Sequence, residues 1–102
     1  MMVFENSAFD ANLAAASGGD AELRAELIAV FRESTLQHIN LLGRARCDGN
    51  WEVAALRLKG LGSSFHSPQL ADLAQQALDS APGDPVILRE LAQFAESLAQ
   101  QG

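Results

Sequence analysis

Residues 56–70 read LRLKGLGSSFHSPQL, and this stretch decides how the middle of the chain folds. It contains the end of one predicted helix and the start of the next. Ser67 followed by Pro68 marks the start, because a serine caps a helix well and a proline is tolerated in the first turn. Apolar and small residues recur at helical spacing before this turn, which predicts a helix that reaches Ser64 or Phe65.

The helix before this turn is expected to take Asn50 as its N-cap and to start at Trp51. Counting by three and four predicts an inward stripe of Trp51, Ala55, Leu58, Gly62 and Phe65. A second stripe on a different side comprises Leu56, Lys59, Gly60 and Ser63. Each glycine inside a helix costs roughly 1 kcal/mol relative to alanine. Gly60 and Gly62 therefore favour a close approach by another backbone or protein over a purely structural helix.

Turn-forming residues delimit further helices on both sides of this segment. A short helix is expected over residues 7–16, where Phe9 and Leu13 form one apolar face. The longest helix is expected from the N-cap Asp20 to about Arg46. This short first helix is interpreted as a lid or N-terminal arm.

The expected core follows the helical periodicity of the other segments. In the longest helix the inward stripe is Leu23, Leu27, Val30, Phe31, Leu41 and Leu42, and Ile28 and Ile39 lie off this stripe on a second face. In the helix after Ser67 the buried side is Leu70, Leu73, Ala74, Ala77 and Leu78. The last helix begins at Asp84 and Pro85 and packs Ile87, Leu91, Phe94 and Leu98 inward.

These patterns predict an all-α protein without strands, since no run alternates with period two. Four substantial helices joined by short connections pack most simply as an antiparallel up-and-down four-helix bundle, here with a short N-terminal helix. A chain of 102 residues forms one small domain. We therefore expect a single domain over residues 1–102, with residues 1–19 as the arm or short helix and residues 20–102 as the bundle.

Charge and composition limit the function classes. Seven basic and thirteen acidic residues give a net charge of −6, and 48% of the residues are apolar. A protein that binds nucleic acid or an anionic membrane needs a basic face, so neither is an expected partner. The chain shows no signal sequence, its longest apolar runs are too short for a membrane span, and its single cysteine, Cys47, suits a reducing compartment. A cytoplasmic protein is expected.

Searches for catalytic motifs find no metal site and no cofactor site in the sequence. His38 and His66 show no metal-ligand spacing, and Gly18 and Gly19 form no phosphate-binding loop. His38 is expected to lie at the boundary of the core and to form a hydrogen bond across the bundle. The sequence therefore predicts a protein that is not an enzyme.

The segment from Leu56 to Leu70 resembles the signature of histidine-containing phosphotransfer (Hpt) domains, whose pattern is HxLKG followed by small residues and then apolar positions. The matching residues are Leu58, Lys59 and Gly60 for LKG, Gly62 to Ser64 for the small stretch, and Phe65 and Leu70 for the apolar positions. The resemblance extends upstream to Gly19, Asp20, Leu23, Leu27, Phe31 and the turn before Trp51. It covers nearly the whole chain.

One position departs from the family pattern. Leu56 stands three residues before Lys59, where the family has its phosphorylated histidine. A leucine side chain has no lone pair and cannot accept a phosphoryl group. The resemblance thus implies an Hpt fold without Hpt chemistry.

Such a module would bind a response-regulator receiver domain or a sensor histidine kinase of a bacterial two-component phosphorelay. The expected binding face is Leu56, Lys59, Gly60 and Ser63, with Arg57 and Gln69 on the margin. An exposed leucine beside a cation and small residues suits protein docking.

Other interpretations remain open at this point. Leu56 can instead be buried under the N-terminal segment against Phe9 or Leu13, and Lys59 can be an ordinary solvated lysine. An active phosphotransfer domain that uses His38 or His66 is one alternative function. A structural or oligomerisation bundle is another.

Overall fold

The computed structural model describes residues 4–100, and these residues contain helices and no strand, which confirms the all-α prediction. The helices are α1 (Phe4–Ser17), α2 (Ala21–Arg44), α3 (Asp48–Ser64), α4 (Pro68–Leu78) and α5 (Pro85–Ala99). Residues 1–3 and 101–102, which the expected domain boundaries include, lie outside the described residues. Within the described part of the chain, no helix combines the length and the hydropathy needed to cross a membrane.

Three helices begin at the predicted caps. The Asp20 carboxylate accepts hydrogen bonds from the backbone N–H groups of Glu22 and Leu23, at 2.9 and 3.2 Å. Ser67 and Asp84 cap α4 and α5 in the same way, and a proline follows each of them at the first helical position. These side chains satisfy backbone donors that have no partner inside the helix.

The bounds of three helices differ from the sequence-based expectation. Helix α1 covers Phe4–Ser17 instead of residues 7–16. The Trp51 N–H donates to the carbonyl of Cys47 at 3.0 Å, so α3 starts at Asp48 and Asn50 is already inside the helix. Asn50 was expected as the cap because asparagine is a preferred N-cap residue, whereas Cys47 caps α3 without any side-chain hydrogen bond. Helix α2 ends at Arg44 instead of Arg46, because Ala45 turns to extended backbone and its side chain is buried.

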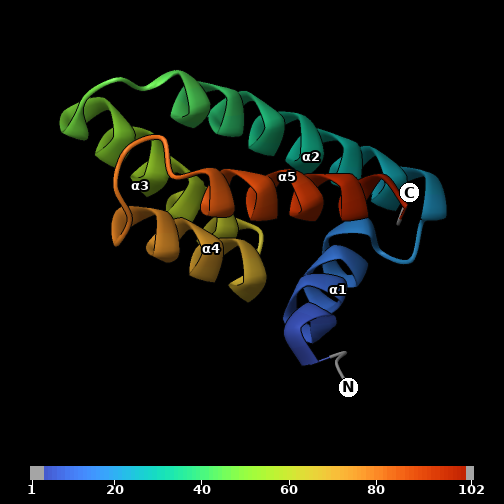
Figure 1. Cartoon of the computed structure of the whole chain (residues 1–102). Helices are drawn as coiled ribbons and strands as arrows, with labels where there is room; N and C mark the ends of the chain where they lie inside the picture. Colours follow the sequence, from blue (N-terminus) through green and yellow to red (C-terminus); the bar gives the residue numbers. More distant parts are fainter. Residues whose placement is uncertain (1–3, 101–102) are drawn as a thin grey trace.

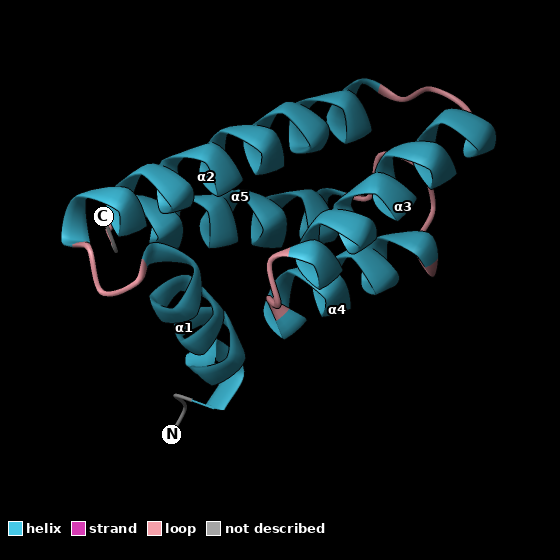
Figure 2. Ribbon diagram, turned by 180° about the vertical axis from the view of Figure 1, so that it is seen from behind, coloured by secondary structure: helices cyan, strands magenta, loops and turns pink. Residues whose placement is uncertain are grey.

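Successive helices from α2 to α5 reverse direction, as Figure 1 shows. Helix α2 contacts both α3 and α5, and α4 also contacts both α3 and α5. The contact between α3 and α4 is the most extensive. Helix α1 packs on α2 and α4 and lies crosswise at one end of the other helices, a placement that Figure 2 shows from the opposite side.

The core is continuous through all five helices. At the end of the core next to α1, Phe31 of α2 is fully buried, and its ring centroid lies 5.2 Å from that of Phe9, 4.6 Å from that of Phe65 and 6.3 Å from that of Phe94. At the opposite end, the Trp51 indole N–H donates to the Ala77 carbonyl at 2.7 Å and ties the start of α3 to the end of α4. The predicted inward residues of α3, α4 and α5 are buried or half-buried.

The inward face of α2 is rotated from its predicted position. Leu23, Val30 and Leu41 were expected in the core, yet they are 38%, 54% and 47% exposed. Ile28 and Thr35 are buried instead. The Thr35 hydroxyl donates to the Phe31 carbonyl at 2.8 Å, so a polar residue lies in the core with its hydrogen bond satisfied. Hydrophobicity alone places the stripe toward the leucines and misses this position.

Candidate functional site

Leu56 lies on the outward side of α3 and is 49% exposed. The interpretation in which it is buried under the N-terminal helix is therefore wrong. Phe9 and Leu13 are themselves buried, and α1 packs against α2 and α4. The chain thus leaves a half-exposed leucine on the outward side of α3.

The two glycines of α3 have different roles. A Cβ built at Gly62 would lie 2.8 Å from the backbone nitrogen of Ala71, so α4 approaches α3 too closely there for any side chain. A Cβ built at Gly60 would have no atom within 4 Å. The close packing of α4 explains why position 62 is a glycine, but no such contact explains Gly60. A glycine at position 60 lowers the stability of the exposed part of α3.

Lys59 is half-buried at the border between α3 and α4. Its Nζ donates a hydrogen bond of 2.7 Å to Oε1 of Gln75, and Nε2 of Gln75 donates to the Asp79 carboxylate at 3.3 Å. Lys59 is therefore held against α4, which differs from an ordinary solvated lysine. An ammonium group has three hydrogens, so this bond leaves donors for a further partner.

The other predicted binding residues separate into different surfaces. Ser63 is exposed on α3, near His66, in a shallow depression that Ala8 also lines. Arg57 is exposed on the side of α3 that faces α2. Gln69 belongs to the first turn of α4 and lies in a groove between α4 and α5. The structure brings Leu56, Lys59, Gly60 and Ser63 together on α3 and its border with α4, and it separates Gln69 from them.

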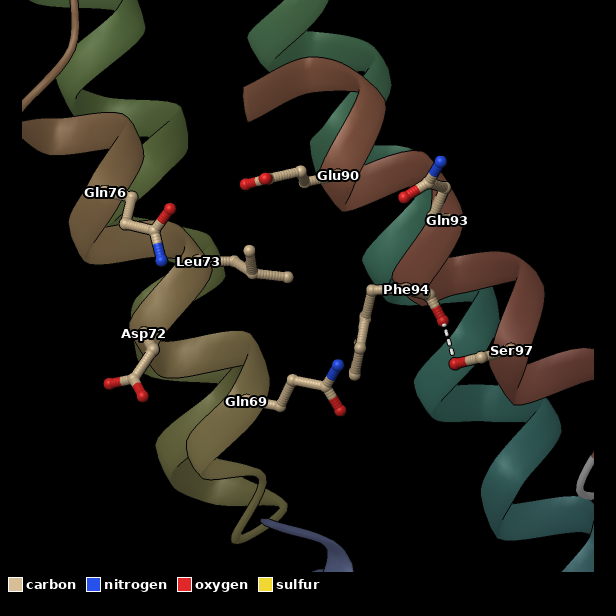
Figure 3. A pocket seen from close by; sticks show the side chains of 8 residues that line it. All are labelled: Gln69, Asp72, Leu73, Gln76, Glu90, Gln93, Phe94 and Ser97. Atoms are coloured by element: carbon tan, nitrogen blue, oxygen red, sulfur yellow. Dashed lines mark hydrogen bonds between the residues drawn. The ribbon is translucent and has the colours of Figure 1, made fainter. Parts of the chain in front are cut away.

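The groove at Gln69 has a volume of about 420 Å³ and is shown in Figure 3. Leu73 and Gln69 of α4 and Phe94 of α5 point into the space between the two helices. The Ser97 hydroxyl donates to the Phe94 carbonyl at 2.6 Å, within α5. Asp72 and Glu90 make the lining acidic. This groove is distinct from the outward side of α3.

Val53 belongs to the exposed surface of α3, although the sequence analysis did not select it. It is 50% exposed and precedes Leu56 by three residues and Gly60 by seven. This spacing places all three on one side of the helix, and counting backward from Gly60 would have found it. We call Val53, Leu56 and Gly60 the α3 outer face.

Neither histidine is one of the residues of this face. His38 Nδ1 lies 2.7 Å from the Ser34 carbonyl in its own helix, so the expected hydrogen bond across the bundle is wrong. One helical turn brings that carbonyl within reach, and no neighbouring helix is needed. His66 is exposed in the turn after α3, where its backbone has a φ of 58°. Its N–H bonds the Ser63 carbonyl while the Ser67 N–H bonds the Gly62 carbonyl, which closes the end of α3 as a Schellman motif.

Within residues 4–100, no group of three or more histidine, cysteine, aspartate or glutamate side chains could hold a metal ion. Comparison with known proteins finds no family model, no curated protein and no solved structure that matches the chain. The α3 outer face is an exposed surface of apolar and small residues, and the Lys59 ammonium group lies beside it. Such an arrangement is suited to contact with another protein.

Proposed function

We propose that this chain is a pseudo-Hpt signalling module, which binds a receiver domain or a sensor histidine kinase and does not carry phosphate. In this proposal α2–α5 form an antiparallel up-and-down four-helix bundle, and α1 closes one end. The chain acts in the cytoplasm as an adaptor, a competitor or a regulatory domain. It is not an enzyme, because Leu56 offers no atom that can accept a phosphoryl group.

The fold is compatible with this proposal. Successive helices from α2 to α5 alternate in direction, and each contacts two neighbours. The α3 segment that resembles the Hpt signature is one continuous helix, so Leu56, Lys59 and Gly60 keep the spacing that the pattern requires. The Lys59 ammonium lies at the border with α4 and retains hydrogens that an acidic partner group can accept.

One observation carries the proposal: Gly60 lies inside α3, four residues before its end and beside an exposed leucine, and among the described residues only the adjacent α3 backbone would lie near an added Cβ. A glycine here lowers helix stability by about 1 kcal/mol relative to alanine and does not improve internal packing. A partner that approaches the α3 outer face closely would benefit from the missing side chain. The exposed Leu56 supplies the apolar contact for the same partner.

The direct test is a titration of the whole chain against a panel of receiver domains, with and without a phosphoryl mimic, and against sensor-kinase domains. We expect Leu56→Asp to weaken the binding of the cognate domain by about 1 to 3 kcal/mol, which is the range of interface hot spots. Helicity and Tm should change little, because Leu56 is half exposed. Val86→Asp is the matched control, since Val86 is 51% exposed on α5, which does not contact α3 in the described structure.

Each alternative function has its own result in this experiment. Incubation with a phosphorylated receiver domain tests the first alternative. Acid-labile phosphoryl label that stays on the chain and is lost in His66→Ala or His38→Ala would identify an active phosphotransfer domain. Self-association without affinity for any tested domain would identify a structural bundle. Loss of helicity in Leu56→Asp would show that this position belongs to the core.

A further inference from the structure

A second surface lies where α3 faces α2, and it shares Val53 with the α3 outer face. The end of α2 and the start of α3 enclose a groove of about 380 Å³. Its lining includes Leu41 and Arg44 from α2 and Asn50, Val53, Ala54 and Arg57 from α3. It differs from the α4 side of α3, where Lys59 is held by Gln75.

The groove has an apolar centre that internal packing leaves uncovered. Leu41 is 47% exposed and Val53 is 50% exposed, and they come from different helices that meet along this groove. Ala54 is buried between them at the base. Two large aliphatic side chains that share one concave surface provide a binding site for the apolar face of another element.

Charge is segregated across α3 in a way that composition does not reveal. The whole chain carries −6, yet both charged side chains in the groove are arginines, Arg44 and Arg57. Asp48 and Glu52, the acidic residues of α3, line a hollow on the side toward the α4–α5 connection. Among the described side chains, the one ion pair within 4 Å joins Arg24 to Asp10, so no described carboxylate forms an ion pair with the groove arginines.

We infer that this groove binds an acidic amphipathic helix of a partner protein. Apolar side chains of that helix would contact Leu41 and Val53, while its carboxylates would pair with Arg44 and Arg57. A helix suits the site because the groove runs between two neighbouring helices, as in helix-in-groove recognition. Two arginines on an acidic protein are too few for nucleic acid, whose binding depends on many phosphate contacts. The inference does not depend on the proposed receiver or kinase interaction.

The test uses the whole chain and fluorescent helical peptides with leucines at positions i, i+3, i+4 and i+7 and glutamates flanking them. Matched peptides carry lysine for glutamate or alanine for leucine. We expect the Glu/Leu peptides to bind at least tenfold tighter than either matched set in fluorescence anisotropy, and we expect their affinity to fall as salt is added. Amide chemical-shift changes on peptide binding should concentrate in residues 41–57.

Charge reversal provides the decisive comparison. The double variant Arg44→Glu, Arg57→Glu should lose affinity for the Glu/Leu peptides and gain affinity for the Lys/Leu peptides, while Val53→Asp should weaken both. Arg89→Glu, an exposed position on α5, is the control that should keep the wild-type preference. Circular dichroism of each variant checks that it is folded.

Several results would overturn the inference. These are equal binding of Glu/Leu and Lys/Leu peptides, no binding by any Glu/Leu peptide, shift changes centred on the groove between α4 and α5, or a folded double variant that keeps the wild-type preference. Equal or tighter binding of an oligonucleotide or an anionic phospholipid vesicle would also overturn it. Binding at this groove does not test the receiver or kinase proposal, because Leu56→Asp addresses that separately.

Discussion

At the scale of single residues, Gly60 and Gly62 provide the sharpest contrast in the molecule. They are two positions apart in one helix, yet one faces open space and the other faces the α4 backbone. A methyl group added at position 60 therefore enters open space, whereas one added at position 62 collides with the α4 backbone. This makes the pair an internal control for the argument that Gly60 serves a contact outside the chain.

We predict that Gly60→Ala raises the free energy of unfolding by about 1 kcal/mol, since alanine is the better helix former. Gly62→Ala should lower it by about 1 to 3 kcal/mol, because the added Cβ is forced against the backbone of Ala71. Urea unfolding followed by circular dichroism measures both changes. Equal shifts in the two variants would contradict the assigned environments.

Some residue environments follow from the sequence and others depend on tertiary partners. The outward position of Leu56 and the inward position of Leu58 follow from helical spacing. The hydrogen bond between Lys59 and Gln75 does not, because its partner is sixteen residues away on another helix. Thr35 was missed for a different reason: its polarity suggests an exposed position, yet its hydroxyl is satisfied by a carbonyl one turn earlier in the same helix, which permits its burial.

At the scale of elements, α1 is attached by apolar contacts more than by charge. Phe9 and Leu13 are almost fully buried. The ion pair between Arg24 and Asp10 has a separation of 3.6 Å, and both side chains are substantially exposed. Solvent screens exposed pairs of this kind, and they contribute little to stability.

We therefore expect Leu13→Ala to lower the free energy of unfolding by about 2 to 5 kcal/mol, the usual cost of truncating a buried leucine. Asp10→Asn should change it by less than about 1 kcal/mol. Thermal and urea unfolding of both variants gives the comparison. A larger loss in Asp10→Asn than in Leu13→Ala would show that charge holds α1 in place.

Three helix starts in this chain were predictable from their capping side chains. Asp20, Ser67 and Asp84 were identified as caps because their side chains provide the acceptor that a first turn needs. Cys47 provides none, and the start of α3 is set by the short connection that follows the buried Ala45. No local sequence signal marks such a start.

At the scale of the whole molecule, one tryptophan reports on the junction of two helices. Trp51 is buried at the start of α3 and bonds the last turn of α4, at the opposite end of the core from the aromatic cluster around Phe31. The core is continuous between these points. Both ends should therefore unfold together.

We predict that urea unfolding is two-state, so that Trp51 fluorescence and far-ultraviolet circular dichroism give the same midpoint and the same slope. Trp51→Phe, monitored by circular dichroism, should lower the midpoint through loss of the bond to Ala77. A fluorescence transition that clearly precedes the loss of helicity would instead show that the α3–α4 junction opens by itself.

The order and approximate extent of the helices were predictable over residues 4–100, because apolar spacing and turn residues divide this part of the chain into segments of helical size. The rotation of α2 was not predictable, since it depends on which sides α1, α3 and α5 occupy. The charge segregation across α3 was also hidden, because Asp48, Glu52 and Arg57 are close in sequence and separate only when the helix is placed between α2 and α4.

The close approach at Gly62 has a mechanical consequence. Because α4 backbone atoms lie so close to Gly62, a slide of α3 along α4 by one helical turn, about 5.4 Å, would bring the side chain of Leu58 or Lys59 onto the α4 backbone. The close contact at Gly62 therefore opposes sliding of α3 and α4 past each other. We therefore expect a partner that displaces α3 to displace α4 with it.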